Sequence, residues 1–261
     1  HPMDVEDCRH WLKNRLRDRH AARLKKPSPD TQWDANSAQA SDDLLMIAEG
    51  VGRCGSARLL LYGEPGTGKT AFAHALARML DKPLQEMRAS DLLSPWVGET
   101  EQRISQAFES AIKDDTVLFI DEVDSLLASR EHAVRNWEVT QVNELLEQLS
   151  DFDGIVVLAT NRLEALDSAV LRRMDAKIRF EVLKAEQLQT SFVQLCQQIP
   201  VVPTAQHLAW ASSLAGLTPG DFACVRRRLA FAPPAPDADM AHVLLTLLHE
   251  ELSLKNKGTQ P

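Results

Sequence analysis

The sequence is poor in cysteine and in long apolar runs, and it has no excess of positive charge. Its four cysteines, Cys8, Cys54, Cys196 and Cys224, lie far apart and form no C-x-x-C pair. This argues against a disulfide framework or a zinc site and predicts reduced cysteines in a cytoplasmic protein. No apolar stretch has the length of about 20 residues that a membrane-spanning helix needs, and no signal peptide is recognisable. The formal net charge of -8 argues against a general nucleic-acid-binding surface.

The length and composition are ordinary for a globular protein. A chain of 261 residues can hold one large domain, or a large and a small one. Its hydrophobic share of 44% and charged share of 25% suffice for a normal core and surface. The dipeptide His1-Pro2 before Met3 is typical of an expression-tag remnant, and we expect the natural protein to be longer.

A glycine-rich loop follows the first strongly apolar run. Residues 59–62 favour a buried strand and residues 71–80 favour a helix; between them stands Gly63-Glu64-Pro65-Gly66-Thr67-Gly68-Lys69-Thr70. This is the P-loop pattern G-x-x-x-x-G-K-[ST] in its usual setting. The glycines let backbone N–H groups turn toward one anion, and the helix that starts near Ala71 adds its dipole. Lys69 supplies a positive charge for phosphates, and the Thr70 hydroxyl can ligate Mg²⁺. The sequence therefore predicts that a nucleoside triphosphate binds here.

Two further apolar runs end in polar residues. Residues 116–120 are followed by Asp121 and Glu122, and residues 154–160 are followed by Asn161. Parallel strands buried on both faces have this appearance, and catalytic groups lie at their carboxyl ends. Asp121 fits Mg²⁺ ligation, directly or through water, while Glu122 can act as the base on an attacking water. The amide of Asn161 can orient that water beside the γ-phosphate.

The remaining elements follow from periodicity and caps. We expect strands over 83–88 and 176–180, a helix over 42–50 capped by Ser41, and helices over 101–113, 137–152 and 166–173. From residue 184 the pattern is helical throughout, with helices over 185–198, 204–215, 220–231 and 237–254. Residues 3–26 are rich in Arg and Lys at helical spacing. They predict either a solvated helix or a patch for nucleic acid or an acidic partner, and residues 27–41 predict a linker.

One loop carries an apolar pair whose burial the sequence leaves open. Trp96 and Val97 stand between Pro95 and Gly98, before a predicted helix. Either the pair folds back onto the core, or it projects as a contact element.

Residues 44–230 resemble the AAA ATPases, because four motifs occur in that family's order. Gly63–Thr70 resembles Walker A, residues 118–122 Walker B, Thr160-Asn161 the sensor-1 position, and residues 166–173 the arginine-finger segment. The resemblance implies an α/β fold with a five-stranded parallel sheet in the order 5-1-4-3-2, followed by a helical lid. The expected division is an N-terminal helix and linker (1–40), a nucleotide-binding domain (41–183), a lid (184–255) and a tail (256–261).

The paired Arg172 and Arg173 are most similar to the branch containing spastin, katanin and the ESCRT-disassembling ATPases, and we expect a bacterial-type member. In that branch the arginines reach a neighbouring subunit's γ-phosphate. Trp96, Val97 and Gly98 resemble the pore loop that contacts substrate, and residues 217–222 resemble the lid segment that places Gly220 near adenine. Whether one of the three arginines at 226–228 also acts on the nucleotide stays open.

The resemblance implies an Mg²⁺-dependent ATPase that forms a homo-oligomer, a hexamer, and threads a polypeptide substrate through a central pore. The alternative is a nucleotide-controlled assembly switch that threads nothing. Trp96 separates the two, because only the motor needs it exposed. A clamp-loader-like function on DNA is disfavoured by the net negative charge of the chain.

Overall fold

The computed structural model describes residues 23–25, 38–96, 98–126, 136–199, 201–232 and 239–258; for 23–25, 136–139 and 256–258 it describes the backbone alone. In chain order, the strands and helices are β1 (Arg23–Lys25), β2 (Gln39–Ala40), α2 (Leu44–Cys54), β3 (Ala57–Gly63), α3 (Lys69–Met79), β4 (Leu84–Arg88), α4 (Ala89–Leu92), α5 (Glu99–Lys113), β5 (Val117–Asp121), the 3₁₀ turn η2 (Val123–Ser125), α6 (Asn136–Asp151), β6 (Ile155–Thr160), η4 (Leu163–Ala165), α7 (Ser168–Arg173), β7 (Ala176–Glu181), α8 (Ala185–Gln198), α9 (Ala205–Ser213), α10 (Pro219–Phe231) and α11 (Met240–Gly258).

A mixed sheet of seven strands lies at the centre of the described residues, in the order β1-β4-β5-β6-β3-β7-β2. The five inner strands are parallel, and β1 and β2 pair antiparallel at the two edges. The prediction of a five-stranded, all-parallel sheet is therefore wrong in strand count and in overall order. The five inner strands do follow one another as 5-1-4-3-2 from β7 to β4 when they are numbered along the chain.

The edge strands explain this error. Arg23–Lys25 was expected in a helix, but it pairs with β4, where Leu24 stands opposite Gln85. The rest of that expected helix lies outside the described residues. Gln39–Ala40 was expected in a linker, but it pairs with β7. A sheet edge exposes unpaired N–H and C=O groups, and a passing segment that satisfies them gains hydrogen bonds that local propensity does not foresee.

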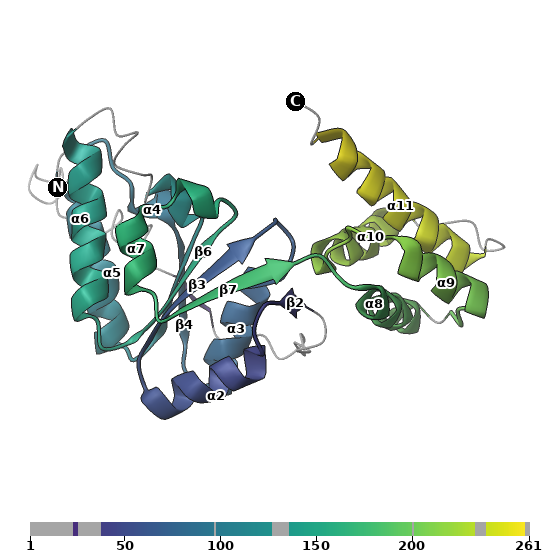
Figure 1. Cartoon of the computed structure of the whole chain (residues 1–261), viewed down its shortest axis with the longest axis horizontal. Helices are drawn as coiled ribbons and strands as arrows, with labels where there is room; N and C mark the ends of the chain where they lie inside the picture. The colour runs from purple at the N-terminus through teal and green to yellow at the C-terminus, as the bar shows by residue number, and fades with distance from the viewer. Residues whose placement is uncertain are drawn as a thin grey trace, which may run out of the picture.

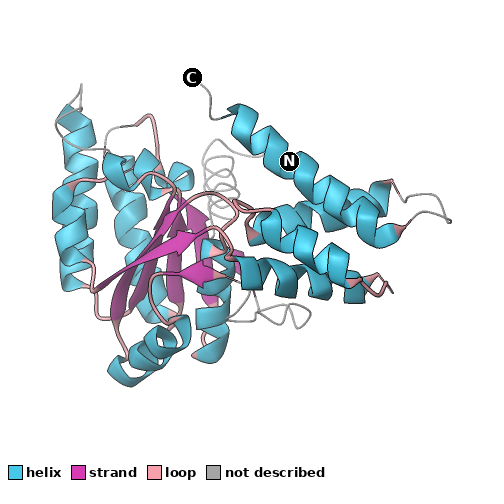
Figure 2. Cartoon of the chain, turned by 45° about the vertical axis from the view of Figure 1, so that its right-hand side comes forward, coloured by secondary structure: helices cyan, strands magenta, loops and turns pink. Residues whose placement is uncertain are grey.

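Helices cover both faces of the sheet (Figures 1 and 2). Successive strand residues point to opposite faces, so Leu60 packs with α5, α6 and α7, while Leu59 and Leu61 pack with α2 and α3. Strands β5 and β6 alternate in the same way. Because both faces are covered, the strands read as continuous apolar runs, as the sequence indicated.

The cap of α2 differs from the prediction. Asp43, not Ser41, accepts hydrogen bonds from the backbone N–H groups of Leu45 and Met46, and the helix runs over Leu44–Cys54 instead of 42–50. The Ser41 hydroxyl accepts a hydrogen bond from Arg179 N at 3.0 Å. Ser41 therefore belongs to the sheet edge, a long-range contact that competes with capping.

The C-terminal helices α8 to α11 pack around a hydrophobic cluster of their own, at the right of Figure 1. Lys255 of α11 donates to the buried Asp221 carboxylate at the start of α10. Helix α11 extends to Gly258, so the expected tail from residue 256 is wrong at its start. Within the part of the chain that the structure describes, no helix combines the length and apolarity needed to cross a membrane.

Candidate nucleotide-binding site

The glycine-rich loop is held in place by close packing against β7 and by a hydrogen bond to its own backbone. Gly63 has a φ of 138°, and a Cβ atom there would lie 2.0 Å from the carbonyl oxygen of Phe180. No larger residue fits without moving β7. The fully buried Thr67 donates its hydroxyl to Glu64 O at 2.7 Å and closes the turn. The loop is therefore preformed, and its N–H groups belong to the turn that precedes α3.

Lys69 is the buried cation of this loop. Its Nζ donates to the carbonyl oxygens of Gly63 (2.7 Å) and Glu64 (2.8 Å). Burial lowers the pKa of Lys69 to about 8, although Asp121 and Glu64 oppose the shift. A partly desolvated ammonium at a helix N-terminus is a good partner for phosphate oxygens. The residues present thus fit a polyphosphate.

Two carboxylates, Asp121 and Glu122, stand at the end of β5 and line the same cleft. Asp121 Oδ2 accepts from the Thr70 hydroxyl at 3.4 Å, which gives two oxygen donors of the kind that Mg²⁺ prefers. Glu122 adopts a left-handed φ of 56°. Its carbonyl oxygen accepts from Ser125 N at 3.1 Å and from Ser125 Oγ at 2.9 Å. Glu122 N also donates to Asp121 Oδ1 at 2.9 Å, so the turn fixes the backbone that carries both carboxylates.

Thr160 and Asp124 join the ends of β5 and β6, although the sequence did not indicate a contact between them. Thr160 Oγ1 donates to Asp124 Oδ1 at 2.8 Å and accepts from Arg162 N at 2.9 Å. Thr160 is almost fully buried. The pair fixes the turns that carry Glu122 and Asn161. The only signal in the sequence was their place beside the two motif residues.

A cleft of about 530 Å³ lies between the sheet and the C-terminal helices, and most of the expected nucleotide-binding and catalytic residues line it. The predicted residues that line it are Pro65, Gly66, Gly68, Lys69, Thr70, Ala71, Asp121, Glu122, Asn161 and Gly220. Gly63, Glu64 and Thr67 are not among the lining residues and support the loop instead.

Most residues on the other side of the cleft were not predicted from the sequence. Helix α8 contributes Ser191, Gln194, Leu195 and Gln198, and α10 contributes Arg226 among others. The spacing of the α8 residues is that of one helix face, i, i+3, i+4 and i+7. Their mixed polarity gave no sign of a ligand. Of the three arginines left open, only Arg226 lines the cleft among the described residues.

The loop and α10 meet through two glycines. Gly220 N donates to Gly66 O at 2.9 Å, and a Cβ atom on Gly220 would lie 2.8 Å from the Gly66 Cα. This distance is shorter than a real Cβ contact allows. Only a residue without a side chain permits the approach, which brings the C-terminal helices onto the phosphate loop.

Four of the described functional candidates, Arg172, Arg173, Trp96 and Gly98, do not line the cleft. Arg172 is exposed; Arg173 donates from Nε to Ser150 Oγ at 2.8 Å and from Nη1 to Ala169 O at 3.1 Å. Neither lines the cleft. Trp96 is 74% exposed, so its interpretation as a core residue is wrong. Gly98 has a φ of 81° at the start of α5, and Val97 lies outside the described residues.

A parallel sheet, a loop of the P-loop type and acidic residues at the next strand end define a P-loop nucleoside triphosphatase. Residues 59–182 match the family model "ATPase family associated with various cellular activities (AAA)". The chain is 32% identical over 218 residues to the human ATPase family gene 2 protein homolog A, covering 76% of this chain and 24% of that protein.

Two other relatives show a similar level of identity. Vacuolar protein sorting-associated protein 4 of Dictyostelium discoideum is 37% identical over 168 residues, covering 62% of this chain and 37% of its own length. The proteasome-associated ATPase of Mycolicibacterium vanbaalenii is 35% identical over 171 residues, covering 55% and 28%. The chain thus spans between about a quarter and two fifths of these three relatives. It contains an ATPase domain of the AAA family.

Proposed function

We propose that this chain is an ATP-hydrolysing motor that assembles into a hexameric ring and remodels polypeptides by threading them through the pore. One observation carries the proposal: Trp96, 74% exposed, stands on a loop outside a cleft that holds a full set of nucleotide-binding groups. In this proposal residues 41–183 bind the nucleotide, residues 184–255 form the lid, and the machine works in the cytoplasm.

Hydrolysis divides among residues of the sheet side. The P-loop N–H groups and Lys69 bind the phosphates of ATP, and Thr70 and Asp121 hold Mg²⁺, which neutralises phosphate charge. Glu122 takes a proton from the attacking water, and Asn161 orients that water. Gly220, in contact with the P-loop, closes the adenine end.

The arginine pair completes the site of a neighbouring subunit. Arg172 and Arg173 lie on α7, outside the chain's own cleft. Charge supplied in this way stabilises the transition state and can raise the rate about 10³–10⁵-fold. Assembly is then a condition for activity.

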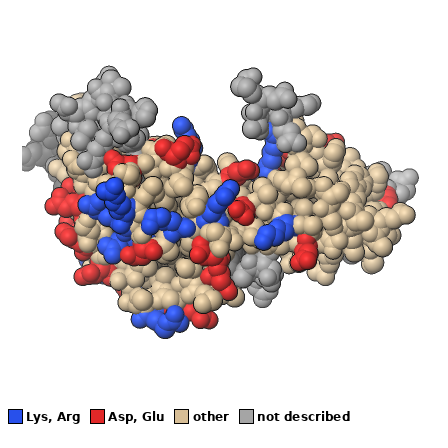
Figure 3. Space-filling model, viewed as in Figure 1, with Lys and Arg blue, Asp and Glu red and all other residues tan. Residues whose placement is uncertain are grey.

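Trp96 suits a substrate of variable sequence. An indole contacts any side chain by area and loses little conformational entropy when it is held. On the face in Figure 3, acidic and basic side chains are intermingled over the sheet-containing part. This supports a polypeptide over nucleic acid as the substrate, since nucleic-acid sites gather positive charge.

The proposal is tested with Trp96→Ala in the full-length protein. Because Trp96 is exposed, the variant should melt like the parent, whereas truncating a core aromatic costs about 3–5 kcal/mol. It should bind and hydrolyse ATP and assemble, but fail to unfold a labelled polypeptide. Met46→Ala, which truncates another exposed apolar residue (68%), is the control. A stable Trp96→Ala variant that still unfolds the polypeptide would favour the assembly switch.

A further inference from the structure

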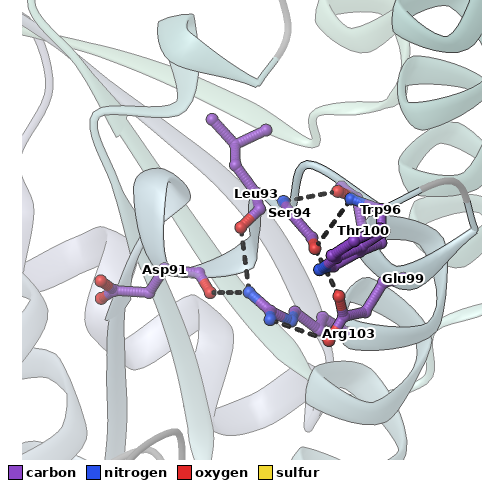
Figure 4. A network of polar contacts seen from close by, with 7 residues as sticks. All are labelled: Asp91, Leu93, Ser94, Trp96, Glu99, Thr100 and Arg103. Atoms are coloured by element: carbon purple, nitrogen blue, oxygen red, sulfur yellow. Dashed lines mark hydrogen bonds and ion pairs between the residues drawn. The ribbon is translucent and has the colours of Figure 1, made fainter.

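The loop that carries Trp96 is joined at its two ends by hydrogen bonds (Figure 4). Ser94 N donates to Thr100 Oγ1 at 2.9 Å, and the Ser94 hydroxyl donates to the Glu99 carboxylate. Within the loop, Trp96 N donates to Ser94 Oγ at 3.2 Å and Glu99 N donates to Trp96 O at 3.3 Å. Thr100 is 1% exposed, so the anchor of this network is part of the core.

Arg103, one turn into α5, connects that network to α4. Its Nη1 donates to Leu93 O at 2.9 Å and to Asp91 O at 3.3 Å, and its Nη2 donates to Glu99 Oε1 at 3.0 Å. Figure 4 shows the guanidinium between these acceptors. A planar group with several fixed donors can hold three acceptors at once, which an ammonium does less well.

This arrangement differs from an ordinary surface ion pair of the same type. Arg53 and Glu49 on α2 have the same i, i+4 spacing, but their closest charged atoms are 4.0 Å apart and the side chains are 74% and 72% exposed. The Arg103 side chain is 23% exposed and its nitrogens meet backbone carbonyls as well as a carboxylate. Solvent screens such a group less, so it can fix a geometry.

We propose that Arg103, together with Ser94, Glu99 and Thr100, is a brace that holds the Trp96 loop in one shape and ties it to α4. Residues of α4 share a hydrophobic cluster with Val123, directly after Glu122. The brace is thus connected through α4 to the turn that follows Glu122. It acts by positioning Trp96 to grip a polypeptide, and in this respect it rests on the proposed motor function.

The brace is tested first by hydrogen exchange, which needs no substrate. In the full-length protein, Thr100→Val and Arg103→Met should raise the exchange rate of amides in residues 94–100 at least tenfold, without changing exchange in the central strands. Thr100→Ser and Arg103→Lys keep a hydroxyl and a charge, so they should show a smaller change. Arg53→Met is the matched control and should leave residues 94–100 unchanged.

The second arm measures the ATP hydrolysis that fluorescein-labelled casein, an unfolded polypeptide, stimulates. Arg103→Met should raise the KM for casein at least fivefold while hydrolysis without casein stays at the parent rate, and Arg103→Lys should restore part of the affinity. A purely structural role of Arg103 would instead lower the affinity for casein and the rate of hydrolysis without casein together.

Unchanged exchange in residues 94–100 of both brace variants would overturn the proposal, and so would fast exchange with an unchanged KM for casein. If Trp96→Ala protein is stimulated by casein like the parent, the motor function fails, and with it the gripping role of the brace. The exchange arm still decides on its own whether the network holds the loop. Arg103 is partly buried and not part of the hydrophobic core, so its variants keep the test open if Thr100→Val does not fold.

Discussion

The two walls of the cleft are built on different principles. The wall formed by the sheet presents Asp121 and Asn161 at or directly after the carboxyl ends of β5 and β6, and Lys69 after the loop that follows β3. Hydrogen bonds between these strands fix their positions. The wall formed by the C-terminal helices has its own hydrophobic cluster and meets the P-loop where Gly220 N donates to Gly66 O. One wall is set by many backbone bonds, the other by a close approach of two glycines.

The difference suggests a division of labour. Catalytic groups must be held to a fraction of an ångström, and the sheet provides that. The helical wall can adjust as a unit, which suits closure over a nucleotide. Variants of the sheet wall should therefore change turnover, and variants of the helical wall should change affinity. The predictions below run from the largest expected effect to the smallest, and those on Glu122 and Gly220 compare the two walls directly.

The largest effect should come from residues that belong to neither wall. Replacing both Arg172 and Arg173 with Ala should lower ATP hydrolysis by the assembled protein about 10³–10⁵-fold, because each subunit would lose the charge supplied by its neighbour. Steady-state phosphate release measures this. Arg162→Ala, an exposed arginine paired with Glu164, is the control.

A mixing experiment separates this from a defect within one subunit. Combining Arg173→Ala protein with Lys69→Ala protein should restore part of the activity, because some interfaces then join an intact Lys69 to an intact Arg173. Full hydrolysis by a demonstrably monomeric Arg172→Ala, Arg173→Ala protein would contradict the role in trans.

Glu122→Gln should lower turnover about 10²–10⁴-fold with little change in ATP affinity, since the amide keeps the shape but accepts no proton. Single-turnover hydrolysis and equilibrium binding together measure both quantities. Asp121→Asn should instead weaken the dependence on Mg²⁺. If Glu122→Gln hydrolyses ATP like the parent, Glu122 is not the general base, and the sheet wall does not determine turnover through it.

On the helical wall, Gly220→Ala should weaken nucleotide binding about tenfold with a smaller effect on single-turnover hydrolysis. The new Cβ would approach the Gly66 backbone at 2.8 Å, so the two walls must separate. Gly50→Ala on α2 is the control, because the nearest atom to its Cβ is 3.9 Å away on a flexible side chain. Unchanged affinity in Gly220→Ala would mean that the helical wall tolerates a shift without loss.

The smallest effect concerns pH. The pKa of Lys69 is lowered to about 8 by burial, and phosphates should raise it again, so binding takes up a proton. Nucleotide affinity should therefore fall about five- to tenfold between pH 7.5 and 9. Titration calorimetry in buffers of different ionisation enthalpy measures the uptake, and Lys69→Arg, which stays charged, should show a flat profile.

The lowered pKa of Lys69 has the opposite consequence for the stability of the protein without nucleotide: stability should rise with pH, whereas nucleotide affinity falls. Between pH 8 and 10.5 the unfolded chain keeps a proton on Lys69 that the folded chain releases, so the free energy of unfolding should rise over this range. A contribution that falls over this window would mean that Lys69 is not desolvated.

Much of the sheet wall could be predicted from the sequence because its determinants are local. A P-loop needs glycines and a lysine at fixed spacing, and buried parallel strands need apolar runs ended by polar residues. The start of α7 is also set locally, since Asp167 accepts from Ala169 N at 2.8 Å, two residues along the chain. Lys69, Asp121, Glu122 and Asn161, which these local patterns indicated, line one cleft.

The tertiary structure alone decided what depends on contacts between distant segments. The edge strands form because a sheet edge has unpaired backbone groups. Ser41 does not cap α2 as expected, because its hydroxyl accepts a hydrogen bond from Arg179 N. The α8 face became part of the cleft only when its helix packed beside the P-loop. The exposure of Trp96 and its brace by Arg103 arise in the same way: sequence spacing sets which residues can meet, and packing decides which of them do.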